Sequence, residues 1–165
     1  MATPTSLPAA VSTGSTGTAA QFNGLRGAFR ILQVVQSQTG SQTASTSLTF
    51  ANTGLSASIT PQSTSSKILA IVQGVAFSST SATDTQLRLT RDQPSAPTVL
   101  STISTCYSQL GGAMLQNYTI VFLDSPASTS ALTYRTQIAR GGGSGIAYDE
   151  VNSSITTLTL MEVSA

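Results

Sequence analysis

The feature that most constrains the fold is a series of short apolar runs, each ended by turn residues, that begins near residue 26. Within Thr85–Arg91, Leu87 and Leu89 point to one side of an extended chain, while Arg88 and Thr90 point to the other. This period of two is that of a half-buried β-strand, and the 3.6-residue period of a surface helix does not stand out anywhere. The pattern therefore predicts an all-β fold.

Nine such apolar runs, each bounded by turn residues, read as strands. We predict strands at Ala28–Ser37, Thr46–Phe50, Leu55–Thr60, Lys67–Ser78, Thr85–Arg91, Thr98–Ser104, Ala113–Leu123, Leu132–Ile138 and Ile155–Val163. Asn52-Thr53-Gly54 should form a turn between two of them. The run Lys67–Ser78 is apolar on both faces, which predicts a central strand with Gly74 at a bulge or close approach. Many short strands favour an antiparallel β-sandwich, and we expect a jelly-roll-like one.

The composition agrees with a folded β-domain and excludes some partners. The chain has 26 serines and 26 threonines, whereas only 8% of its residues are charged. A hydrophobic fraction of 39% argues against disorder, which needs low hydrophobicity. The net charge of +1 provides no field that would attract nucleic acid or a membrane, so we expect neither as a partner. So few charges suit a chain that sits in an assembly.

The N-terminal segment differs from the rest of the chain. We divide the sequence into an extended arm at residues 1–25 and a single domain at residues 26–165. The arm is rich in Pro, Gly, Ser and Thr, and it has neither a signal-peptide pattern nor a membrane-spanning run. It is either an unattached terminus or an anchor that orders on a neighbouring subunit. In the second case Leu7, Val11 and Phe22 would be the anchoring side chains, and Arg26 and Arg30 would contact the partner.

Most catalytic arrangements are excluded by residue type. The chain has no histidine and one cysteine, Cys106, so the Ser-His-Asp, Cys-His and usual zinc arrangements cannot form. Cys106 lies in an apolar stretch and should be a buried, inert thiol. We expect no catalytic residue, no metal ligand and no cofactor.

Two adjacent acidic residues follow the glycine-rich stretch 141–145. Adjacent Asp149 and Glu150 should point to opposite faces of a strand, and with Asn152 they form the only cluster of Asp, Glu and Asn residues in the sequence. A glycosidase carboxylate pair or a calcium site could use them. We favour solvated turn residues.

Tyr148, beside the glycine-rich stretch 141–145, is the tyrosine that we expect to contact a partner at the surface.

Four phrases resemble a module of tailed-phage virion proteins. The first is Ile31-Leu-Gln-Val-Val-Gln, and the second is Gly54-Leu-Ser-Ala-Ser-Ile-Thr-Pro with the Ser-Thr-Ser-Ser-Lys-Ile-Leu that follows it. The third runs from Leu123-Asp-Ser-Pro to Leu132-Thr-Tyr-Arg, and the fourth is the terminal Ser154-Ile-Thr-Thr-Leu-Thr-Leu-Met-Glu-Val. The module is a trimeric β-sandwich at the C-terminus of tail fibres and in small decoration proteins, including those of cyanophages. Phe29-Arg30 departs from its usual Gly-Lys.

The resemblance implies a non-enzymatic homotrimer on the exterior of a tailed-bacteriophage virion. We expect a decoration or cement protein, or a short appendage, that binds capsid or tail subunits through its arm. The alternative is a tail-fibre tip module that binds host-surface polysaccharide, with Tyr148 in contact with the glycan. A glycosidase acting through Asp149 or Glu150 ranks third.

Overall fold

The computed structural model describes residues 30–80, 82–92, 96–107, 112–151 and 153–164. This part of the chain forms ten strands: β1 (Ile31–Thr39), β2 (Thr43–Ser45), β3 (Ala51–Ile59), β4 (Lys67–Ser78), β5 (Asp84–Arg91), β6 (Thr98–Thr105), β7 (Met114–Asp124), β8 (Leu132–Gly142), β9 (Ala147–Asp149) and β10 (Thr156–Val163). In the described residues no helix is long and apolar enough to cross a membrane.

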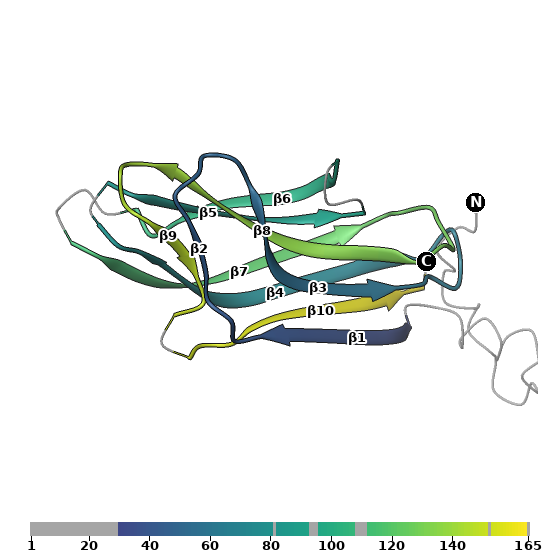
Figure 1. Ribbon diagram of the computed structural model, residues 1–165. Coiled ribbons are helices and arrows are strands. Elements are labelled where there is room, and N and C mark those ends of the chain that lie inside the picture. Colours follow the sequence, from purple (N-terminus) through teal and green to yellow (C-terminus); the bar gives the residue numbers. More distant parts are fainter. Residues whose placement is uncertain (1–29, 81, 93–95, 108–111, 152, 165) are drawn as a thin grey trace, which may run out of the picture.

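The strand order confirms a jelly roll. Six strands form one sheet, in which β1, β10, β4 and β7 are neighbours, and β3, β8, β5 and β6 form the other. Without the three-residue strands β2 and β9, eight long strands remain, and they pair from the outside of the sequence inwards. The pairs are β1 with β10, β3 with β8, β4 with β7 and β5 with β6. This is one long antiparallel hairpin rolled into a two-sheet sandwich. Figure 1 shows the sheets as two layers, with β1, β10 and β4 on one side and β5 and β6 on the other.

The core lies between the sheets and follows the predicted alternation. Leu87, Leu89, Tyr134 and Ile138 are at most 1% exposed, as are Val72 and Leu160 from the opposite sheet. Cys106 is part of this core, as expected. Burying each such large apolar side chain contributes roughly 1.5–3 kcal/mol before the entropy of ordering is subtracted.

Strand prediction failed in one region. Thr46–Phe50 forms no strand, and Asn52-Thr53-Gly54 is not a turn but part of the continuous strand Ala51–Ile59. Gly54 has φ of +92°, and the pairing of β3 with β8 shifts register between Asn52 and Ser56. The glycine therefore creates a bulge inside the strand, because it adopts a conformation that other residues rarely do.

Elsewhere the predicted strands are confirmed with small shifts at their ends. Lys67–Ser78 is a strand with those bounds and lies between β7 on one edge and β10 with β9 on the other. Thr90 lies on the same face as Arg88, as predicted, but it is buried, and its hydroxyl donates to the Arg135 carbonyl oxygen at 3.3 Å. The short strands β2 and β9 were not predicted. Residues 28 and 29 of the first predicted strand lie outside the described residues.

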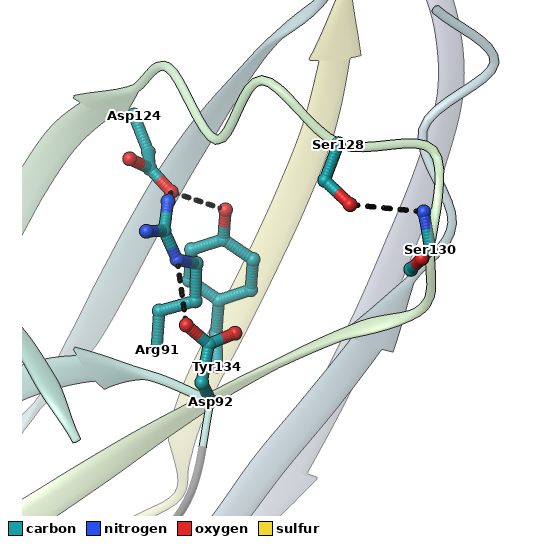
Figure 2. A network of polar contacts seen from close by, with 6 residues as sticks. All are labelled: Arg91, Asp92, Asp124, Ser128, Ser130 and Tyr134. Atoms are coloured by element: carbon teal, nitrogen blue, oxygen red, sulfur yellow. Dashed lines mark hydrogen bonds and ion pairs between the residues drawn. The ribbon is translucent and has the colours of Figure 1, made fainter. Parts of the chain in front are cut away.

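A polar network connects the two sheets at one end of the sandwich (Figure 2). Arg91, the last residue of β5, forms an ion pair with Asp124, the last residue of β7, at 2.5 Å. Tyr134 of β8 donates its hydroxyl hydrogen to the same Asp124 oxygen at 2.7 Å, and the more exposed Asp92 binds Arg91 at 3.1 Å. The buried Asp124 carboxylate is thus matched by both a cation and a donor.

Candidate interaction surface

The outer face of the six-stranded sheet carries aligned apolar side chains. Residues opposite one another in a sheet point to the same face, so the register defines rows across the strands. One row runs through Val34, Met161, Leu69 and Leu123, on β1, β10, β4 and β7. In adjacent rows Ile71 lies opposite Val121 and Ile31 lies opposite Val163. We call these eight residues the outer apolar face.

Several of these side chains are open to solvent. Val121 is 59% exposed, Ile31 58%, Val34 56% and Leu123 51%. The others are half-buried by their neighbours within the sheet. Isolated apolar residues at a surface are ordinary, but a contiguous set across four strands is typical of an interaction site.

The borders of the outer apolar face are polar but almost uncharged. Gln36 and Thr159 belong to the row that contains Ile71, and the next row holds Gln38, Thr157, Gln73 and Thr119. Among the described residues that the register places on this face, Lys67 is the charged one. Such a surface has little charge to keep another copy away.

Tyr148 is less exposed than its place in the sequence suggested. It belongs to β9, where it lies opposite Phe77 of β4, and the two ring centroids are 5.5 Å apart. Its side chain is half-buried. Leu115 of β7 lies on the other side of Phe77 and is 51% exposed. The three residues extend the apolar surface at the far end of the same sheet.

The other predicted contact residues lie at or beyond the start of the described chain. Arg30 is exposed, and its backbone exchanges hydrogen bonds with Ser164 beside the edge strand β1. Leu7, Val11, Phe22 and Arg26 lie outside the described residues, as does the rest of the 1–25 segment.

The acidic pair is buried, so the expectation of solvated turn residues is wrong. Asp149 is 0% exposed and Glu150 is 2% exposed. They do not occupy opposite faces of a strand either, because β9 ends at Asp149 and Glu150 has φ of +65°. The Glu150 amide donates to the Val75 carbonyl oxygen of β4, which holds both residues against the central strand.

Burial also sets the acid–base properties of the pair. Desolvation raises the pKa of Asp149 to about 6, despite the hydrogen bond that it accepts from Tyr118 at 2.8 Å. Desolvation and the neighbouring Asp149 raise the pKa of Glu150 to about 7. Burial, together with the hydrogen-bonded Asp149, raises the pKa of the Tyr118 hydroxyl. In the described part of the chain no group of three or more His, Cys, Asp or Glu side chains gathers.

Comparison with known proteins gives remote structural likenesses. No family model matches the chain, and no characterised protein matches it in sequence. The VP2 subviral particle protein of infectious bursal disease virus superposes with a TM-score of 0.36 and 13% identity, over 79% of this chain and 39% of that one. The T13 viral particle of the same virus superposes with a TM-score of 0.37 and 13% identity, over 79% of this chain and 37% of that one. The Gx strain of the virus gives a TM-score of 0.36 and 13% identity, over 81% of this chain and 40% of that one. The chain thus covers less than half of each of these proteins.

Proposed function

We propose that the chain is a non-enzymatic structural protein of a virion, which assembles with further copies of itself and with other particle proteins. The observation that carries the proposal is the outer apolar face. Its apolar side chains Val34, Val121 and Leu123 are exposed to solvent on the β1–β10–β4–β7 sheet. Covering it with protein would remove this surface from water, a gain of roughly 25 cal/mol per Å². The resemblance to the phage virion module supports the same class of function.

A second copy of the chain is the occupant that we propose for this face. Two copies can approach without strong repulsion, because Lys67 is the charged residue among the described ones on the face. The Gln and Thr rows beside it would form the polar rim that protein interfaces usually have. In the trimer that we propose, the outer apolar faces of three copies meet around one threefold axis.

The N-terminal segment would attach this assembly to the particle. The described chain begins at Arg30, beside β1 and Ile31 at the edge of the outer apolar face. Residues 1–25 would leave from that edge and order on a neighbouring capsid or tail subunit through Leu7, Val11 and Phe22, with Arg26 and Arg30 in contact with the partner. A location on the exterior of a tailed-phage particle, as a decoration, cement or short appendage protein, fits this arrangement.

Binding of host polysaccharide through Tyr148 has less support. Sugar-binding faces usually depend on exposed aromatic rings, whereas the Tyr148 ring packs against Phe77 and is half-buried.

Cryo-electron microscopy of particles from the source of this chain would test the proposal. We expect density for the jelly roll on the particle exterior, with residues 1–24 extended onto a neighbouring subunit. Particles assembled with a chain that lacks residues 1–24 should lose this density while the truncated protein stays folded. Particles without the chain, or full occupancy by the truncated protein, would contradict the proposal.

A further inference from the structure

The interior of the sandwich contains a group of oxygen atoms without hydrogen-bonding partners. They belong to Asp149 (Oδ2), Glu150 (Oε1 and Oε2) and Thr156 (Oγ1), and each is shielded from solvent. Thr156 is 0% exposed, and its hydroxyl faces both carboxyl groups and lowers their pKa, although none of its contacts has ordinary hydrogen-bond geometry. Two carboxylates and an independent hydroxyl therefore converge on one buried point.

The backbone around this point leaves room for the oxygens. Tyr118 of β7 lies opposite Gly74 of β4, and Thr156 begins β10 on the other edge of β4. A Cβ atom at position 74 would lie 2.3 Å from Thr156 Oγ1 and 2.9 Å from the Tyr118 hydroxyl. Gly74 is thus the residue type that allows polar groups from three strands to meet inside the sheet.

The other buried acids of the described chain are neutralised or well hydrogen-bonded, which makes this pair exceptional. Asp124 is bound by Arg91 and Tyr134. Glu162 accepts hydrogen bonds from the Gln33 side chain at 2.6 Å and the Gln62 amide at 2.7 Å, and its pKa is lowered. Within the described part of the chain no arginine or lysine faces Asp149 or Glu150, and the titratable groups around them are each other and Tyr118. Buried carboxylates without such partners usually take up protons or bind a metal ion.

We propose that Asp149, Glu150 and Thr156 bind a divalent cation, with Ca²⁺ as the preferred ion. A proton shared between two of these oxygens would leave the other oxygens without a partner, whereas one cation accepts several oxygen ligands at once. The donors are oxygen only, which suits hard cations. Ca²⁺ accepts irregular sets of carboxylate and hydroxyl oxygens, whereas Mg²⁺ demands near-octahedral geometry and retains water. The bound ion would join the end of β9 to the start of β10 and so hold both strands against β4.

Calorimetry on the full chain tests this site. After treatment with EDTA and exchange into calcium-free buffer at pH 7.5, titration with CaCl2 should show saturable binding of one ion per chain. At a calcium concentration about a hundred times the dissociation constant, the melting temperature should rise by roughly 5–10 °C. MgCl2 at the same concentration should give a smaller rise. Absence of both heat and thermal shift with CaCl2 would overturn the proposal.

Neutral, isosteric variants locate the ion. Asp149→Asn and Glu150→Gln should each lower the calcium affinity at least tenfold, and each should raise the melting temperature in EDTA because a buried charge is removed. Glu162→Gln is the matched control: it changes a buried acid on the same strand as Thr156 and should keep the calcium response. A response that is lost in Glu162→Gln but kept in the other two variants would also overturn the proposal.

Discussion

Leu69 of β4 lies directly opposite Leu123 of β7 on the outer face of the six-stranded sheet, and Leu123 keeps 51% of its surface exposed. A leucine pair of this kind usually lies between the two sheets of a jelly roll. Here the inner face has its own complete set of apolar residues, with Ile68 and Val72 buried on the same strand. The strand β4 is therefore apolar on both faces, and the second face is the one that we assign to assembly.

The ion pair between Arg91 and Asp124 should contribute strongly to stability. Arg91→Ala removes the cation that lies 2.5 Å from Asp124, whose side chain is 8% exposed. An uncompensated carboxylate would then remain buried, so we expect the free energy of unfolding to fall by roughly 3 kcal/mol. Chemical denaturation followed by circular dichroism measures this loss. Asp92→Asn, which changes the exposed partner of the same arginine, should cost less than about 1 kcal/mol. Equal losses would show that the position of the charge inside the sandwich does not matter.

Gly74 should not tolerate a side chain. In Gly74→Ala the new methyl group would lie 2.3 Å from Thr156 Oγ1 and 2.9 Å from the Tyr118 hydroxyl, and the β-branched Thr156 cannot easily rotate away. We expect a loss of about 1–3 kcal/mol in the free energy of unfolding. Gly40→Ala provides the control, because the nearest atom to its new Cβ is 3.7 Å away. A Gly74→Ala protein as stable as Gly40→Ala would mean that the packing around Thr156 is loose.

Without divalent ions, stability should fall as the pH rises from about 4 to about 7. The folded-state pKa is about 6 for Asp149 and about 7 for Glu150. Both values exceed those of the unfolded chain, which are about 3.9 and 4.3. In this range the folded state holds more protons than the unfolded state, so the stabilising contribution of the pair is complete below the unfolded values and is lost by about pH 7. The lowered pKa of Glu162 acts in the opposite sense, in more acidic solution.

Melting temperatures measured in EDTA across this range would show the slope. The double variant Asp149→Asn with Glu150→Gln should flatten it, because neither side chain then titrates. An unchanged slope in the double variant would assign the pH dependence to other groups.

Alternation in the sequence was sufficient to predict the fold class and most strands. Each strand that buries one face, such as Thr85–Arg91 or Leu132–Ile138, shows its period of two directly. Prediction failed at Gly54, because a glycine beside Asn and Thr indicates a turn as readily as a bulge inside a strand. The short strands β2 and β9 have three residues each, too few for any period to appear.

The buried acidic pair could not be recognised from the sequence. Asp149 and Glu150 follow a glycine-rich stretch, where polar residues are normally solvated. Their burial depends on contacts with Tyr118, Val75 and Thr156, which are brought together by three strands. The exposure of the outer apolar face could not be predicted for a related reason. The apolar run of β4 indicates that both of its faces are buried, but the sequence does not show whether the same chain or another copy would bury them.

Sedimentation equilibrium of the full-length chain tests the assembly role most directly, with Val121→Lys and Val99→Lys as matched variants. Val121 lies on the outer apolar face and is 59% exposed, whereas Val99 of β6 lies on the other sheet and is 47% exposed. We predict that the wild-type chain forms a species of three times its 16.9 kDa mass, that Val121→Lys weakens association at least tenfold, and that Val99→Lys does not. A wild-type protein that stays monomeric at every concentration, or equal weakening by the two lysines, would contradict the account.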